Sequence, residues 1–105
     1  MTEITVDNLI DRRHEYVGHA VNVRGILDAI DIRTGFLAGE SYIRLEGEIW
    51  KTYIYSRGTL TRNDKDRLLP YLDAFLGKEI TCEVGVSEHN SLQKIMFGDH
   101  EFSFR

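Results

Sequence analysis

Apolar residues recur at two different periods along this chain, and each change of period marks a predicted element. Residues 5–17 carry apolar side chains at helical spacing, with Thr5 as the expected N-cap and Gly18 directly after the last turn. Between residues 20 and 32 the period changes to two, which predicts a single long strand. The alternation changes phase around Gly25, where a missing side chain permits a bulge or bend. The pattern therefore predicts a helix followed by a bent strand.

The middle of the chain predicts a hairpin of two strands. Residues 41–46 alternate between apolar and polar, Gly47 marks a tight turn, and residues 49–56 are rich in aromatic and β-branched side chains. We expect Trp50 to point into the core together with Thr52 and Ile54. The opposite side of the second strand mixes a cation with two phenols, so we expect it to face outward.

The last third of the chain predicts one helix and two strands. A second apolar stripe at helical spacing lies within residues 61–76, with Thr61 or Asn63 as its cap and Gly77 after its end. Because Pro70 lacks an N–H and clashes with the preceding turn, the helix should begin near Pro70 or contain an offset turn before it. Residues 79–87 alternate regularly and should bury Cys82. A final strand is expected over 92–97, and residues 101–105 continue it after a break.

The order of these elements resembles the OB (oligonucleotide/oligosaccharide-binding) fold, in particular bacterial domains of the tRNA-anticodon-binding-like type. The resemblance lies in "ITVDNLIDRRHEYVGHAVNVRGIL" and "LGKEITCEVGV", where a helix ends at glycine and a strand begins. It implies a mostly β fold with two helices, in which a five-stranded, partly open Greek-key barrel has a helix between strands three and four. The single domain would span 1–105, with its first helix over 5–17 and the barrel over 20–105. The alternative is a small α+β barrel of another topology, such as an SH3-like barrel.

Charge is distributed unevenly along a chain that is acidic as a whole. The 105 residues carry a net charge of −4, and a uniformly acidic surface would repel nucleic acid. Residues 1–32 and 63–105 each carry a net charge of −3, whereas residues 33–62 carry +2. Any surface suited to phosphate is therefore expected in the middle of the chain.

In OB domains the ligand binds the outer surface of strands two and three and the flanking loops, and the resemblance transfers this face to the middle of the chain. The residues that it implies are Arg33, Phe36, Tyr42, Arg44, Lys51, Tyr53, Tyr55 and Arg57. Aromatic side chains with interleaved cations suit single-stranded nucleic acid, because bases stack on the rings and cations follow the phosphates. The tyrosines could also be simple strand formers, and the cations could pair with Glu40, Glu46 and Glu48.

Catalytic and metal-binding motifs are not expected in this sequence. The four histidines form no i,i+4 pair and no pair with the single cysteine, Cys82, so we expect neither a metal site nor a disulfide. Nucleophile-elbow and phosphate-loop motifs are absent. Without a signal-peptide pattern or an apolar run of about 20 residues, a cytoplasmic protein is expected. The sequence thus predicts a non-enzymatic binding module without cofactor.

Two functional hypotheses follow, and they use different parts of the chain. The first is a small module that binds single-stranded nucleic acid through the face of strands two and three. The alternative is an acidic protein–protein interaction domain, such as an adaptor, an inhibitor or an immunity-type protein, whose acidic ends contact a basic partner. No membrane partner is expected. Uncovered sheet edges would permit a dimer, so the oligomeric state stays open.

Overall fold

The strands of this protein pair into a sheet that closes into a ring. The computed structural model describes residues 2–35 and 39–104. Its elements are β1 (Glu3–Thr5), α1 (Val6–Asp11), α2 (Arg13–Tyr16), β2 (Ala20–Asp31), β3 (Tyr42–Glu46), β4 (Lys51–Tyr55), α3 (Arg62–Phe75), β5 (Glu79–Gly85), β6 (Ser91–Phe97) and β7 (His100–Ser103). The strand order is β1-β2-β3-β4-β6-β5, and β5 also pairs with β2, which closes the ring. The prediction of a mostly β chain is confirmed.

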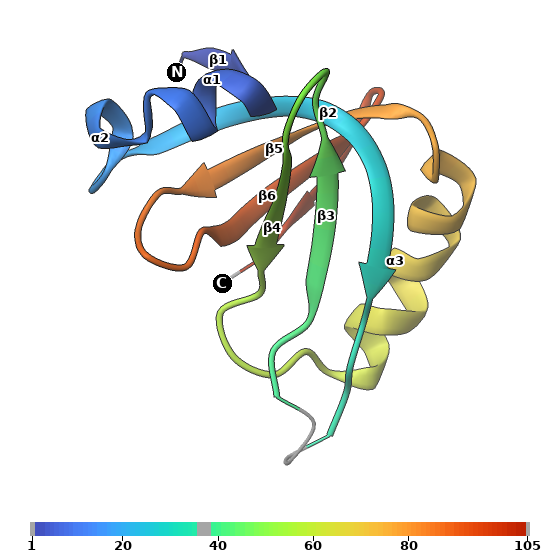
Figure 1. Cartoon of the computed structure of the whole chain (residues 1–105). Coiled ribbons are helices and arrows are strands. Elements are labelled where there is room, and N and C mark those ends of the chain that lie inside the picture. The colour runs from blue at the N-terminus through green and yellow to red at the C-terminus, as the bar shows by residue number, and fades with distance from the viewer. Residues whose placement is uncertain (1, 36–38, 105) are drawn as a thin grey trace.

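The long strand β2 takes part in both halves of the ring because it bends. Its first half, from Ala20 to Ile26, pairs antiparallel with β5, and its second half, from Ile26 to Asp31, pairs antiparallel with β3. The register shifts between Leu27 and Ala29, as expected for a bulge at the bend. Figure 1 shows β2 curving from β5 round to β3, with α3 next to its second half, on the side away from β3. The predicted bent strand is confirmed.

Alternating side chains of the strands fill the inside of the ring. Ile43, Leu45 and Ile54 of the hairpin are fully buried, and Cys82 is buried at the middle of β5. Burial raises the pKa of the Cys82 thiol, so this side chain behaves as a small apolar group, as predicted. α3 adds Leu68 and Leu72 to the same core. One hydrophobic core therefore unites the strands and the helix.

The predicted helix over 5–17 is wrong as a single element. Residues 3–5 form β1, which pairs parallel with β2, and the helical stretch is divided at Arg12 into α1 and α2. Arg12 leaves the helical region at φ −119° and ψ 28°. The predicted cap is confirmed, because the Thr5 hydroxyl accepts a hydrogen bond from the backbone N–H of Asn8 at 3.1 Å. Gly18, at φ +86°, ends the segment in the left-handed region as expected.

The second helix does not begin at Pro70. α3 begins at Arg62, and Thr61 and Asp64 form a reciprocal capping box with two hydrogen bonds of 3.1 Å. Pro70 lies exposed inside this helix, so the fold loses one backbone hydrogen bond there without burying an unpaired group. The strong cap upstream of Pro70 explains why the helix extends through the proline.

The C-terminal segment forms a hairpin and does not continue the previous strand. β7 pairs antiparallel with β6, from Phe97 opposite His100 to Lys94 opposite Ser103. Gly98 has φ +61°, which allows the reversal between the two strands. The turn places Phe102 in the core, where it is 5% exposed. No helix in the described part of the chain has the length and apolar character needed to cross a membrane.

Trp50 does not lie in the core, which corrects the prediction made from its strand alternation. β4 begins only at Lys51, and Trp50 is 47% exposed in the turn before it. The turn is closed by a 2.7 Å hydrogen bond from the Gly47 N–H to the Trp50 carbonyl. The Asp7 carboxylate also accepts hydrogen bonds from the backbone N–H groups of residues 48, 49 and 50. This contact from α1 takes Trp50 out of the strand.

Candidate ligand-binding face

Direct cross-strand pairs bring most of the predicted binding residues together on the outside of the ring. In the β3–β4 ladder, Tyr42 lies opposite Tyr55, Arg44 opposite Tyr53, and Glu46 opposite Lys51. Because side chains alternate along a strand, all six point to the same side, and their neighbours point into the core. The hairpin thus places three tyrosines, two cations and one carboxylate on one outward surface.

The three tyrosines of this surface, Tyr42, Tyr53 and Tyr55, form a cluster that we call the tyrosine face. The ring centroids of Tyr42 and Tyr53 are 5.2 Å apart, edge to face. Those of Tyr53 and Tyr55 are 6.4 Å apart and nearly parallel. Tyr53 is 43% exposed, so a large part of its ring is open to solvent. The face therefore combines mutual packing, which orients the rings, with an accessible aromatic surface.

The two cations of the hairpin are held by a carboxylate from the bend of β2. The Asp28 carboxylate forms ion pairs with Arg44, whose Nε lies 2.8 Å away, and with Lys51, whose Nζ lies 3.0 Å away. Lys51 Nζ also lies 3.3 Å from the Glu46 carboxylate. The hydrogen bond from Arg44, followed by the one from Lys51, lowers the pKa of Asp28. The hydrogen bond that Lys51 donates to Asp28 in turn raises the pKa of Lys51. Both cations stay charged, but their charge is already partly compensated.

Arg44 also links this ion cluster to the tyrosine face. Its guanidinium carbon lies 5.7 Å from the centre of the Tyr53 ring, and its Nη1 donates to the Tyr53 hydroxyl at 3.3 Å. A cation over an aromatic ring is attracted by the negative face of the ring. Asp28, Arg44 and Tyr53 therefore form one chain of contacts that holds the aromatic side chain of Tyr53 in place.

Two buried serines hold the ends of the strands beneath the tyrosine face. Ser41 and Ser56 exchange hydrogen bonds, from the Ser41 N–H to Ser56 Oγ at 3.0 Å and from the Ser56 N–H to the Ser41 carbonyl at 2.8 Å. Ser41 Oγ accepts from the Arg33 N–H at 2.8 Å. The three chain segments that carry Arg33, Tyr42 and Tyr55 are thus tied to one another.

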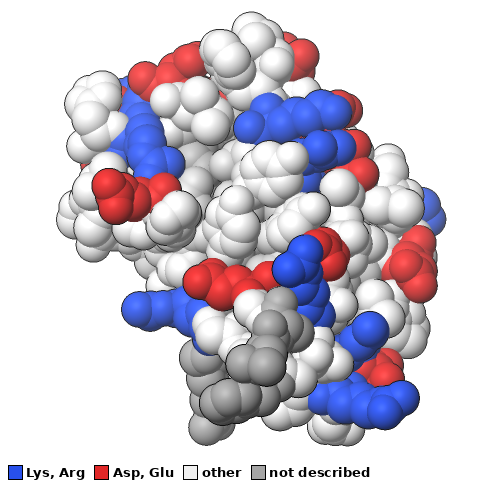
Figure 2. All heavy atoms as spheres, turned by 60° about the horizontal axis from the view of Figure 1, so that its bottom comes forward, with Lys and Arg blue, Asp and Glu red and all other residues white. Residues whose placement is uncertain are grey.

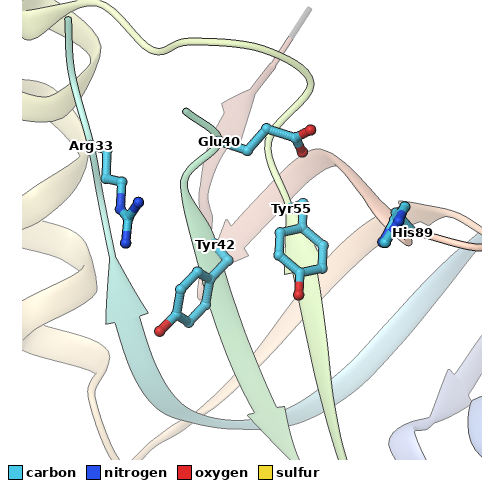
Figure 3. Close-up of a pocket in the computed structure, with 5 residues that line it drawn as sticks. All are labelled: Arg33, Glu40, Tyr42, Tyr55 and His89. Carbon is cyan, nitrogen blue, oxygen red and sulfur yellow. The ribbon is translucent and has the colours of Figure 1, made fainter. Parts of the chain in front are cut away.

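A hollow of about 420 Å³ opens beside the tyrosine face. Its lining residues are Arg33, Glu40, Tyr42, Tyr55 and His89. Figure 3 shows Arg33 next to Tyr42 on one side, with His89 beyond Tyr55 on the other and the Glu40 carboxylate extending toward Tyr55 and His89. The imidazole of His89 meets the Tyr55 ring edge-on at 5.9 Å. The hollow has aromatic walls and carries a charged group of each sign at its rim.

The other three predicted binding residues, Arg33, Arg57 and Phe36, lie outside the β3–β4 hairpin. Arg33 lines the hollow and pairs with Asp31, its Nη2 lying 3.0 Å from the Asp31 carboxylate. Arg57 is exposed and lines an adjoining hollow that shares Glu40, Tyr55 and His89 with the first. Within residues 2–35 and 39–104, Arg57 makes no ion pair. Phe36 lies outside the described residues.

Sequence reasoning missed two residues of the hollow as binding residues, Glu40 and His89. In the sequence, Glu40 appeared only as a counter-charge for the cations, and His89 only as one of four histidines that form no metal-binding pair. His89 reaches Tyr55 because β4 meets β6 where the ring closes, with Tyr55 opposite Ser91. No local pattern indicates that approach, because it depends on the closure of the whole ring.

The charge of this side of the molecule is mixed. Figure 2 shows basic and acidic side chains interspersed around an area of uncharged residues, without a continuous basic stripe. Among the residues that the structure describes, no group of three His, Cys, Asp or Glu side chains could hold a metal ion. The arrangement is therefore suited to a ligand that stacks on rings and meets a few charged groups.

Comparison with known proteins adds no family to this description: no family model, no curated protein and no solved structure matches the chain.

Proposed function

We propose that this chain is a non-enzymatic binding module of the OB type that binds single-stranded nucleic acid on its tyrosine face. Support for the fold assignment comes from the ring order β2-β3-β4-β6-β5 and from the position of α3, which lies along the chain between β4 and β5, the third and fourth ring strands in sequence order. The observation that carries the binding proposal is the cluster of Tyr42, Tyr53 and Tyr55 on one outer surface, beside a hollow with aromatic walls.

Stacking would supply most of the affinity for such a ligand. Each base that stacks on an aromatic ring contributes about 1–3 kcal/mol, and stacking tolerates any base. The hairpin cations contribute less than their number indicates, because Asp28 and Glu46 already pair with Arg44 and Lys51. Arg57, which has no acidic partner among the described residues, is the best placed contact for a phosphate.

Salt dependence follows from this division of roles. Binding to a single strand loses affinity with salt at a logarithmic slope of about −0.7 for each neutralised phosphate. One or two phosphate contacts therefore predict a shallow slope between about −0.7 and −1.4. A strongly basic groove would give a much steeper slope.

The proposal is tested by fluorescence anisotropy with a labelled single strand of mixed sequence at low and at moderate salt. We expect Tyr53→Ala to weaken binding by roughly 5- to 150-fold, the range that corresponds to one stacked base. Tyr53→Phe should retain binding, since it keeps the ring. Trp50→Ala is the matched control, because Trp50 is similarly exposed but lies in the turn before β4. Absence of binding at low salt, or equal losses in Tyr53→Ala and Trp50→Ala, would contradict the proposal.

An acidic protein-binding module is the second candidate, and one observation favours it. Ile49 is 74% exposed and Trp50 is 47% exposed, both in the turn between β3 and β4. The adjacent carboxylates of Asp7, Glu46 and Glu48 would favour a basic partner. This candidate predicts that a purified basic partner binds the wild-type chain and the Tyr53→Ala variant but not the Trp50→Ala variant.

A further inference from the structure

Glu40 differs from the other carboxylates around the tyrosine face because it has no cationic partner among residues 2–35 and 39–104. Asp28 pairs with Arg44 and Lys51, Asp31 with Arg33, and Glu46 with Lys51. Glu40 makes no hydrogen bond or ion pair within the part of the chain that the structure describes. Its carboxylate nevertheless lies at the rim of the hollow, on the side of Tyr55 and His89 (Figure 3). A ligand in the hollow therefore meets an acceptor with free lone pairs.

A carboxylate in that position repels phosphate and favours a group that offers N–H donors. An ionised carboxylate has only acceptors, and its two oxygens suit two parallel N–H donors. The bases of a single strand expose their Watson–Crick edges to such contacts. Guanine presents N1–H and N2–H side by side on that edge. Adenine and cytosine each present one N–H donor next to a ring nitrogen that accepts, and thymine and uracil present one N–H between two carbonyls. Guanine alone matches both carboxylate oxygens.

We infer that the hollow is a base-selective subsite that takes guanine, with the Watson–Crick edge of the base on Glu40 and its ring stacked against Tyr42 or Tyr55. The inference rests on the proposed function, and it adds base selectivity to a face that would otherwise bind any sequence. The phosphates of the strand are directed away from Glu40. On one side of the hollow they meet Arg33, and on the other side they meet the exposed Arg57.

The expected size of the preference for guanine follows from its bidentate contact with Glu40. A good bidentate pair between a side chain and a base discriminates against the wrong base by about 1–3 kcal/mol, which is roughly 5- to 150-fold. Because Glu40 is exposed, we expect the lower part of that range, about tenfold. Inosine keeps the N1–H donor but has a C2–H in place of the 2-amino group. This C–H neither donates strongly nor repels the second carboxylate oxygen as the accepting N1 of adenine does, so the affinity for inosine should fall between those for guanine and adenine.

The experiment measures anisotropy with a series of labelled nine-residue oligonucleotides, oligothymidine with one central G, I, A or C, and with the all-thymidine strand. We expect the order G, then I, then A and C together with T. Glu40→Gln should abolish the preference for G while retaining binding to the all-thymidine strand, because an amide offers one acceptor and one donor group. Glu48→Gln, the same change at an exposed carboxylate of the β3–β4 turn, should keep the preference.

The outcomes of this experiment distinguish a failure of the guanine inference from a failure of the proposed function. Equal affinities across the series for the wild-type protein would overturn the guanine inference and leave the proposed function in place. A preference for G that persists in Glu40→Gln would overturn the role of Glu40. No measurable binding to any oligonucleotide would overturn both the inference and the proposed function.

Discussion

Asp28 is the residue that controls how much positive charge the tyrosine face offers. It lies where the register of β2 shifts, and its carboxylate is within 3.0 Å of both Arg44 Nε and Lys51 Nζ. Replacing it by the isosteric amide removes the negative charge between two cations. If the face binds a single strand, Asp28→Asn should tighten binding and steepen the salt slope by about 0.7–1.4, the equivalent of one or two further phosphates.

The control for this prediction separates local from global charge. Asp73→Asn makes the same change of net charge on the exposed surface of α3 and should leave both affinity and salt slope close to wild type. Anisotropy titrations of the three proteins at several salt concentrations give the comparison. Weaker binding by a folded Asp28→Asn protein would show that Asp28 positions the face and does not restrain its charge.

Asp7 is a single residue that stabilises the β3–β4 turn, and this stabilisation depends on pH. Its carboxylate accepts three backbone N–H groups of the β3–β4 turn, and the one from Trp50, at 2.9 Å, does most to lower the pKa of Asp7 below its usual value of 3.8. A carboxylate with a depressed folded-state pKa stabilises the fold above its unfolded-state pKa and loses that contribution as pH falls through the folded-state pKa. Asp7→Asn should therefore lower the thermal midpoint at pH 7.

The difference between wild type and Asp7→Asn should stay constant from pH 7 to about pH 5 and shrink as the pH falls below about 4. Thermal unfolding followed by circular dichroism across this range measures it. Asp73→Asn again serves as the control, because its carboxylate lies on the exposed surface of α3. A difference that persists unchanged at pH 3 would rule out the ionised carboxylate as the source of the stabilisation.

At the scale of elements, α1 packs against the ring only because Gly25 lacks a side chain. A Cβ at this position would lie 2.7 Å from Val6 Cγ2 and 3.2 Å from both Leu45 Cβ and the Glu46 carbonyl oxygen. These neighbours belong to α1 and β3, which cannot both retreat. Gly25→Ala should therefore destabilise the protein by about 1–3 kcal/mol, as overpacking of a core does.

Gly85→Ala is the matched control for that substitution. A Cβ at Gly85 would also come within 2.7 Å of other atoms, but these are the side-chain ends of Ser91 and Gln93, which can turn away. Urea unfolding of both variants should show a clearly larger loss of stability for Gly25→Ala. Equal losses would mean that the close approach of α1 to β2 does not depend on the glycine.

The elements also show which parts of this molecule can be predicted from sequence. Alternation and caps are local, so the bend of β2 and the outward tyrosines of the hairpin could be predicted. Trp50 could not, because the turn that exposes it is held by Asp7, which is 43 residues away. Glu40 and His89 were missed as binding residues for a related reason: His89 reaches the tyrosine face only through the pairing of β4 with β6.

For the molecule as a whole, the pairing of β4 with β6 is the weakest strand pairing that closes the ring, and we call it the seam. β2 and β5 pair over seven consecutive residues, whereas β4 and β6 share one pair, Tyr55 with Ser91, supported by a 2.9 Å hydrogen bond from the Tyr55 N–H to the Asn90 carbonyl. Local opening occurs first where few backbone hydrogen bonds must break. The ring should therefore open between these two strands before it opens between β2 and β5.

The seam also crosses the hollow, because Tyr55 lies on one side of it and His89 on the other. A ligand that contacts both residues binds the closed ring better than the open one and must shift the opening equilibrium toward the closed state. In native-state hydrogen exchange, we expect the Tyr55 amide to exchange faster than the paired amides of residues 80–84. Adding a guanine-containing single strand should slow exchange at Tyr55 and leave residues 80–84 nearly unchanged. Protection that rises equally in both regions would indicate global stabilisation, and a Tyr55 amide as slow as those of β5 without ligand would contradict the weak seam.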